Sequence, residues 1–282
     1  MMKLVNQQES LPLSNQNQFK VTSVVQAMRD SWNHLAIEDA MHHIASEKQN
    51  WIEEDFFGSG ERDVTRYLDP VLSRLDFDPR DKKLLEIGCG LGRMSFNLSK
   101  RFGEVDALDI SPEMIKRAIE YKEKLGVSNV HFHLGGGKDL AGFGKESFDF
   151  CFSYIVFQHI PNVDLIFDYV REIGRVLKPG GIFLFQVNGY LHFRLGGTTY
   201  LWCGICDTGR LRNWGIERRP FLRLGKLDLM GGVPIKRSAM LKVCESVGLK
   251  VEDLNGNYSQ YAWYVGRKSH STYGSDTQTA GE

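Results

Sequence analysis

The residues best placed to do chemistry lie in the stretch Leu84–Met94, which reads LLEIGCGLGRM. A short apolar run ends at Glu86. Glycines follow at alternate positions, namely Gly88, Gly90 and Gly92. Because glycine lacks a Cβ atom, a turn of this kind lets the main chain approach a ligand closely. The pattern predicts a buried parallel strand, a tight turn and the start of a helix, which is typical of a site for a nucleotide-like molecule.

The spacing of the glycines helps to choose the ligand. A dinucleotide-binding turn has the order G-x-G-x-x-G, whose third glycine allows close packing of the helix on the strand. Here the third glycine comes one position early, at Gly92, and Arg93 takes the fingerprint position. A long charged side chain fits the pyrophosphate geometry poorly. A dehydrogenase is therefore the weaker alternative, and nicotinamide binding would reveal it.

An acid follows at the distance expected for a ribose ligand. Asp109 ends the next predicted strand, 21 positions after Gly88. A carboxylate there can accept hydrogen bonds from both ribose hydroxyls, and charge-assisted bonds of this kind are comparatively strong. The alternative is an acid that only favours the N-terminal end of the next helix.

Around these residues, strands and helices alternate. After the strand that contains Glu86, further strands are predicted over 104–109, 130–134, 148–154 and 182–187, with helices over 112–125 and 162–177. This order predicts a parallel, doubly wound sheet with right-handed crossovers. A helix over 236–247 and strands over 250–254 and 260–266 then suit a closing antiparallel hairpin. The expected fold class is α/β, a mostly parallel seven-stranded sheet with a terminal antiparallel strand.

The segments outside this alternation are expected to flank or cover the sheet. Residues 1–18 and 269–282 are rich in small polar side chains and predict a disordered leader and tail. Residues 19–79 predict a helical N-terminal lid ahead of the core domain at 80–268. Residues 188–234 break the rhythm and predict an insertion after strand five that covers the substrate.

Within the N-terminal lid we expect two helices. Apolar positions recur at helical spacing between residues 24 and 44, and a second helix is predicted over 62–75. Between them, residues 51–60 place aromatic side chains next to a glycine-rich turn.

Composition and charge exclude several classes of protein. The 35 basic and 35 acidic residues give a formal net charge of zero, so no general attraction to nucleic acid or to an anionic membrane is implied. No apolar run approaches the roughly 18 residues of a membrane span, and the N-terminal residues lack the apolar region of a signal peptide, so neither is expected. Five cysteines favour packed free thiols in a reduced, cytoplasmic enzyme. Cys203 and Cys206 have the spacing of a redox pair but lack its strand-to-helix context, so packed thiols are expected there too.

Four motifs in the right order resemble the class I S-adenosylmethionine-dependent methyltransferases. They lie in the segments Glu86–Gly92, Leu108–Met114, Phe148–His159 and Leu177–Gly181. The resemblance covers most of the chain and implies a Rossmann-like fold with S-adenosylmethionine as cofactor. The implied cofactor contacts are Glu86, Gly88, Cys89, Gly90, Gly92, Arg93, Asp109, Ile110, Met114, Gly136, Gly137, Lys138, Ser153 and Tyr154.

By the same resemblance, each part of the cofactor has its own residues. Gly88, Cys89 and Gly90 would lie against the methionine part and Asp109 would bind the ribose. Ile110 and Met114 would flank the adenine.

The sequence departs from the family after the third strand. The family usually has Gly-Asp-Ala or similar there, and the aspartate reaches the adenine amino group. This chain has Gly135-Gly136-Gly137-Lys138-Asp139, so a glycine replaces the acid. Two substitutes are considered, namely the backbone of Gly136 and Gly137, and Asp139 in a shifted loop.

Methyl transfer from a sulfonium is a direct displacement, so positioning supplies much of the rate. A base is needed only when the acceptor must lose a proton early. The candidates are His159 at the end of strand four and His192 just after strand five. The alternative for His159 is a capping or packing role before Pro161. His42 and His43 have no second ligand cluster nearby, so no metal site is expected.

The acceptor pocket is expected beneath the lid and the insertion. Its aromatic candidates are Trp32, Trp51, Phe57, Tyr190 and Trp202, although such side chains also serve as a lid's own core. The expected function is methyl transfer to an oxygen or nitrogen of a small molecule, a saccharide or a secondary metabolite. One alternative is methylation of RNA or protein through the basic stretch 210–226. Another is a non-catalytic cofactor-binding partner protein, and the oligomeric state is not predicted.

Overall fold

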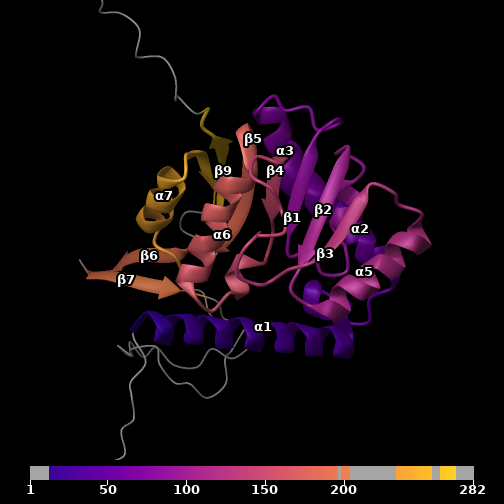
Figure 1. Cartoon of the computed structure of the whole chain (residues 1–282), viewed down its shortest axis with the longest axis horizontal. Coiled ribbons are helices and arrows are strands. Elements are labelled where there is room, and N and C mark those ends of the chain that lie inside the picture. Colours follow the sequence, from indigo (N-terminus) through magenta and orange to yellow (C-terminus); the bar gives the residue numbers. More distant parts are fainter. Residues whose placement is uncertain (1–12, 196–197, 204–232, 256–260, 271–282) are drawn as a thin grey trace, which may run out of the picture.

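A seven-stranded sheet forms the centre of the computed structural model, which describes residues 13–195, 198–203, 233–255 and 261–270 (Figure 1). Its strand order is β3-β2-β1-β4-β5-β9-β8. The strands are β1 (Lys83–Ile87), β2 (Glu104–Asp109), β3 (Val130–Leu134), β4 (Phe148–Ser153), β5 (Leu177–Asn188), β8 (Leu249–Asn255) and β9 (Tyr261–Lys268). Strands β1 to β5 pair in parallel, and β9 runs antiparallel to both β5 and β8. The expected fold class is confirmed, with the antiparallel strand seated between β5 and β8.

Apolar side chains alternate between the two faces of the sheet, as a strand buried on both sides requires. Leu84, Phe150 and Leu184 pack with the helices of one face, whereas Leu85 and Phe183 pack with those of the other. The first face carries α2 (Glu53–Asp63), the π-helical turn η1 (Val64–Leu68), α3 (Asp69–Arg74), α4 (Ser95–Leu98) and α5 (Pro112–Leu125). The second face carries α6 (Val163–Val176) and α7 (Arg237–Ser246).

Helix α1 (Leu13–Ile44) lies across one end of the sheet (Figure 1). It extends further towards the N-terminus than expected, so residues 13–18 are helical and the disordered leader was wrong for them. Asp39 has non-helical backbone angles and kinks the helix, and its Oδ1 accepts a hydrogen bond from the His42 amide at 3.1 Å. The predictions for residues 1–12, 204–232 and 271–282, including Cys206 and the basic stretch, lie outside the described residues.

The glycine-rich turn expected at 51–60 was also wrong. Gly58 and Gly60 lie inside α2, which continues through η1 into α3, so the predicted helix over 62–75 starts too late. The cause is tertiary packing, because a Cβ atom on Gly60 would lie only 2.0 Å from the carbonyl oxygen of Arg93. Gly60 thus allows α2 to approach the chain that follows the glycine motif.

Two further boundaries differ after the fourth strand. Strand β5 begins at Leu177, so the segment Lys178–Gly181 belongs to the strand and does not separate it from the preceding helix. The first part of the predicted irregular insertion is a hairpin of β6 (Tyr190–Leu195) and β7 (Thr198–Cys203).

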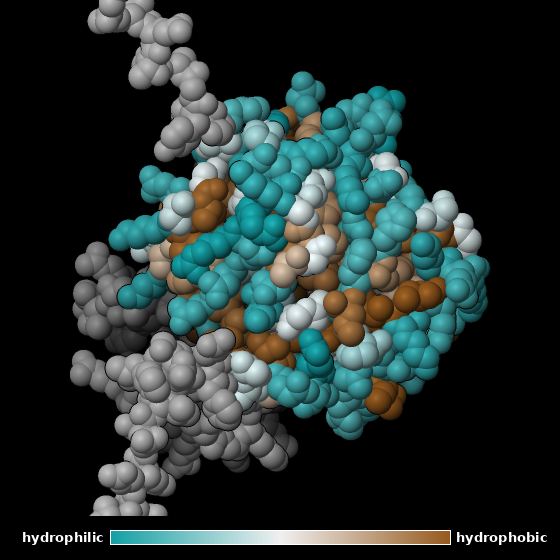
Figure 2. All heavy atoms as spheres, in the orientation of Figure 1, coloured by the Kyte–Doolittle hydropathy of each residue, from teal (hydrophilic) through white to brown (hydrophobic). Residues whose placement is uncertain are grey.

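Hydrophilic side chains predominate on the face shown in Figure 2, and the hydrophobic ones gather mainly in its lower half. Two exposed apolar residues, Ile119 on α5 and Leu134 at the end of β3, border a shallow groove beside the edge strand. None of the helices in the described part of the chain has the length and hydrophobicity needed to span a bilayer.

Candidate active site

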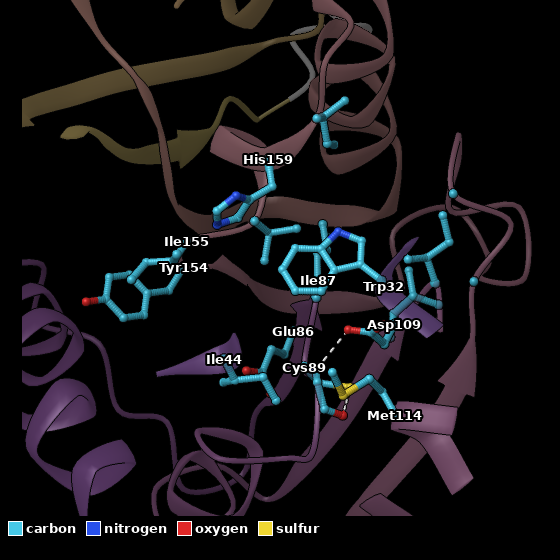
Figure 3. A pocket seen from close by; sticks show the side chains of 18 of the residues that line it. Trp32, Ile44, Glu86, Ile87, Cys89, Asp109, Met114, Tyr154, Ile155 and His159 are labelled. Atoms are coloured by element: carbon cyan, nitrogen blue, oxygen red, sulfur yellow. Dashed lines mark hydrogen bonds between the residues drawn. The ribbon is translucent and has the colours of Figure 1, made fainter. Parts of the chain in front are cut away.

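A cavity opens at the carboxyl ends of β1, β2 and β4, next to α1 (Figure 3). It holds about 1040 Å³ of space between atoms, part of it open to solvent. The lining residues are Met28, Trp32, His43, Ile44, Glu86, Ile87, Gly88, Cys89, Gly90, Arg93, Met94, Leu108, Asp109, Ile110, Met114, Gly135, Gly137, Tyr154, Ile155, Val156, His159, Ile160 and Tyr169. This is the crevice in which doubly wound sheets bind their ligands.

The glycine turn forms the floor of this cavity. Gly88, Gly90 and Gly92 all have positive φ angles, which other residues adopt at a cost. The amides of Gly88 and Cys89 donate to the carbonyl oxygen of Leu108 at 2.7 and 3.0 Å, which ties the turn to the end of β2. A Cβ atom on Gly88 would lie 2.2 Å from the Val156 side chain. The turn therefore leaves bare main chain facing the cavity.

Asp109 joins this turn to the next helix. Its Oδ2 accepts a hydrogen bond from the Gly90 amide at 2.9 Å, and its Oδ1 accepts one from the Ser111 amide at 2.9 Å. Burial raises the pKa of its carboxyl group, while these backbone donors favour the charged form. Each oxygen retains acceptor capacity, so the carboxylate can hold the turn and bind a hydroxyl in the cavity.

Two more charged groups line the cavity behind the turn. Glu86 is only 4% exposed and accepts a hydrogen bond from Ser95 Oγ at 2.5 Å. Arg93 is also buried, and its Nη1 donates to Asp63 Oδ2 at 2.7 Å and to Ser59 Oγ at 3.0 Å. Its Nε has no hydrogen-bond partner among the described residues. A buried donor without a partner fits a site for a polar ligand group.

We predict that Glu86→Gln stabilises the protein at alkaline pH. Burial raises the pKa of Glu86 from 4.5 to about 7, so the folded state keeps a proton that the unfolded chain releases. Stability therefore falls as the pH rises from 4.5 to 7, and the whole penalty applies above pH 7. In urea unfolding at pH 8 the variant should gain about 2 kcal/mol, and near pH 5 the gain should shrink below about 1 kcal/mol. A gain that is the same at both pH values would contradict this account.

Helix α1 forms one wall of the cavity and is held in place by polar contacts. Arg29 Nη2 donates to the carbonyl oxygen of Gly135 at 3.0 Å. Asn33 Oδ1 accepts from the Glu113 amide at 3.0 Å, at the start of α5. Arg117 donates to a carbonyl oxygen of α1 at 2.6 Å. The predicted N-terminal lid therefore lies on the end of the sheet and supplies four of the lining residues.

Aromatic and imidazole side chains gather on the side of the cavity next to α1. The ring of His159 meets that of Trp32 edge to face at a centroid distance of 5.4 Å. Figure 3 shows both on the side of the cavity opposite Glu86 and Cys89. Tyr154 stacks on Trp263 at 5.4 Å with an interplanar angle of 9°. Burial is the main cause that raises the pKa of Tyr154, so its hydroxyl stays protonated.

Several residues predicted for the cofactor do not line the cavity. Gly92 faces Phe96 and Phe132, and Ser153 Oγ donates to the Ile87 carbonyl oxygen at 3.1 Å, which joins β4 to β1. Gly136 and Lys138 lie in the loop after β3, from which the predicted Gly137 and its neighbour Gly135 line the cavity.

The predicted aromatic lining was also partly wrong. Trp51 Nε1 donates to the Ala45 carbonyl oxygen at 2.7 Å, and Phe57 packs against Phe96 and Tyr121. Both belong to the cores around the lid because α2 packs there on α4 and α5. Of the predicted aromatic residues, Trp32 lines the cavity.

Three candidates lie in the hairpin after β5. Tyr190 and His192 lie in β6, and Trp202 lies in β7. His192 of β6 pairs with Leu201 of β7. Their side chains lie outside the described part of the structure. Among the cavity residues that sequence reasoning missed is His43, which faces Glu38 with an Nε2–Oε2 distance of 3.5 Å. No local pattern marks it, because its position depends on how α1 docks.

The cavity fits S-adenosylmethionine on four observations. The exposed main chain of the glycine turn lets the methionine part of the cofactor approach closely. The Arg93 Nε, which has no hydrogen-bond partner among the described residues, can donate to the carboxylate of that part. Asp109 suits the ribose. Ile110 and Met114 add apolar lining suited to a flat base.

The segment that contains the glycine turn resembles known proteins. Residues 85–185, from β1 to β5, match the methyltransferase domain family. The ubiquinone biosynthesis O-methyltransferase of Xanthomonas axonopodis pv. citri is 32% identical over 122 residues, which are 43% of this chain and 48% of that protein. Malonyl-[acyl-carrier protein] O-methyltransferase 2 of Ilyobacter polytropus is 36% identical over 110 residues, 38% of this chain and 39% of that protein. The chain thus spans about half the length, or less, of these curated relatives.

Among solved structures, geranyl diphosphate C-methyltransferase from Streptomyces coelicolor A3(2) has a TM-score of 0.55 at 14% identity. The match covers 87% of this chain and 98% of that one, and it shows the fold alone. The family match confirms the predicted family, and the structural match agrees with its fold. The chain carries a class I S-adenosylmethionine-dependent methyltransferase domain, and its cofactor is S-adenosylmethionine.

Proposed function

We propose that the protein transfers a methyl group from S-adenosylmethionine to an oxygen of a small molecule. The observation that carries the proposal is the cavity next to α1, which joins the glycine turn and Asp109 to a side lined by Trp32 and His159. The two curated relatives named above are O-methyltransferases, which favours oxygen over nitrogen as the acceptor atom. A saccharide or a secondary metabolite remains the proposed substrate class.

Each residue has a positioning task in this reaction. When bound, the cofactor supplies an electrophilic methyl group on its sulfonium. Asp109 and the glycine turn hold the ribose and the amino-acid portion. Arg93, whose Nη1 is held by Asp63, offers a positive group to the carboxylate of that portion. Helix α1 excludes water from its side of the cavity. Holding nucleophile, methyl group and sulfur in line supplies much of the rate acceleration.

His159 is the proposed base that accepts the proton of a hydroxyl acceptor. It lies in the 3₁₀ turn η2 (Phe157–His159) just after β4, lines the cavity, and is oriented by its contact with Trp32. His43 is the second imidazole in the cavity and the competing candidate.

We predict that His159→Ala lowers kcat by about 100-fold, the usual lower range for loss of a general base. The dissociation constant for S-adenosylhomocysteine should stay within about threefold, because His159 acts on the acceptor, not on the cofactor. Isothermal titration and turnover measurements separate these effects. His42→Ala is the matched control, because His42 is a histidine next to the cavity residue His43 on α1 and does not itself line the cavity. Full activity in His159→Ala, or a loss confined to His43→Ala, would remove His159 from this role.

The acceptor is found by transfer of a radiolabelled methyl group into an extract that is divided into small molecules and macromolecules. Label in the small-molecule fraction supports the proposal and provides the product for identification. Label only in RNA or protein would favour macromolecular methylation instead. The Asp109→Ala variant serves as the control, since it should leave both fractions unlabelled at low cofactor concentration.

A further inference from the structure

The loop after β3 leaves the adenine end of the cavity without an acidic side chain. The backbone of Gly135 is already hydrogen-bonded to other parts of the protein. Its amide donates to the Asp109 carbonyl oxygen at 2.7 Å, and its carbonyl oxygen accepts from Arg29 Nη2 at 3.0 Å. The Gly135 amide is thus not available to the base, whose polar edge is left to the backbone of the next two glycines or to a side chain from another element.

The carboxylate of Asp139 is not that group in this structure. Its Oδ1 accepts from the Ala141 amide at 3.3 Å, and its Oδ2 lies 4.0 Å from Lys138 Nζ. The side chain is 36% exposed and does not line the cavity. The loop is thus not shifted in the way that would let Asp139 substitute.

Tyr169 contributes a buried phenol to the same cavity from another element of the fold. It lies on α6, lines the cavity together with Gly135 and Gly137, and is 6% exposed. Its ring packs against Phe157 at a centroid distance of 5.6 Å, which fixes the direction of the side chain. No hydrogen bond joins its hydroxyl to any other residue within the described ranges.

The hydroxyl of Tyr169 is neutral at physiological pH. Burial raises its pKa, and the negative charges of Asp139 and then Asp109 raise it further. A neutral phenol both accepts and donates a hydrogen bond. It can accept from an amino group, as the missing carboxylate would, without bringing a third negative charge near these two acids.

We propose that the Tyr169 hydroxyl recognises the 6-amino group of the cofactor's adenine in place of the acid replaced by Gly136. The inference rests on the proposed cofactor site and adds the residue that selects the base. It explains why a glycine is tolerated in the loop, since the polar contact comes from α6 instead.

The test measures binding of S-adenosylhomocysteine and of its analogue that carries purine, without the 6-amino group. The wild-type protein should bind the adenine compound about tenfold more tightly, the value of one net hydrogen bond. Tyr169→Phe should bind both compounds equally, with the purine analogue bound as by the wild type. The variant would then have lost only the part of the affinity that depends on the 6-amino group.

Tyr264→Phe is the matched control. Tyr264 is a buried tyrosine, 1% exposed, on β9 and outside the cavity. This variant should keep the preference of the wild type. A full preference in Tyr169→Phe, or no preference in the wild type, would overturn the inference while leaving the cofactor assignment intact. If the wild-type protein binds neither compound, the cofactor site fails and the inference falls with it.

Discussion

Asp109→Ala should weaken the binding of S-adenosylhomocysteine by about 100-fold, the equivalent of two charge-assisted hydrogen bonds. The carboxylate lies in the cavity beside the glycine turn and already orients the amides of Gly90 and Ser111. Its loss removes the acceptor for the ribose hydroxyls and releases the turn. Isothermal titration of both proteins measures the effect.

An analogue of S-adenosylhomocysteine that lacks both ribose hydroxyls separates the loss of the ribose contact from the release of the glycine turn. If the carboxylate binds the ribose directly, the variant and the wild type should differ much less for this analogue. An equal loss for both compounds would show that Asp109 acts only through the turn, and unchanged affinity would overturn its role altogether. Asp139→Ala is the control, because that carboxylate lies near the cavity without lining it.

Gly60→Ala should destabilise the protein by about 3 kcal/mol, as expected when a methyl group is forced into a filled space. The new Cβ atom would lie 2.0 Å from the Arg93 carbonyl oxygen and 2.9 Å from Asn97 Nδ2, so α2 would have to move away. Since Arg93 lines the cavity, cofactor affinity should fall as well. Urea unfolding measures the change in stability.

Gly58→Ala provides the matched control within the same helix. A Cβ atom on Gly58 has no neighbour within 4 Å, so alanine should stabilise the protein by about 0.5 to 1 kcal/mol through its better helix propensity. Opposite signs for the two variants would support the close packing of α2. Equal effects would show that α2 does not lie against the Arg93 backbone.

Elements marked by local signals were predicted from the sequence. The run Ser111-Pro112 predicted the start of α5, and Ser111 Oγ indeed accepts a hydrogen bond from the Met114 amide at 3.2 Å. Strand β2 and helix α5 have the predicted bounds. In these cases the alternation of apolar residues, the cap and the turn all favour the same structure, so no tertiary information is required.

The errors arose where tertiary packing overrides a local signal. Gly58 and Gly60 indicate a turn by sequence, yet α2 runs through both because it packs on the loop before α4. Trp51 was assigned to the pocket for its aromatic type, but its indole N–H donates to the carbonyl oxygen of Ala45, the residue after α1. His43 and Tyr169 enter the cavity from helices whose docking no local pattern reveals.

The position of β9 has a consequence for how the sheet is completed. This strand comes last among the described strands, yet it occupies an interior place between β5 and β8. During synthesis, the edges of β5 and β8 that pair with β9 therefore stay unpaired until residues 261–268 have left the ribosome. Unpaired edges invite association with other chains. A fragment made only of the matched segment 85–185 would lack β9, so the β5 edge that pairs with it would stay exposed. The segment that matches the methyltransferase family therefore does not complete the sheet by itself.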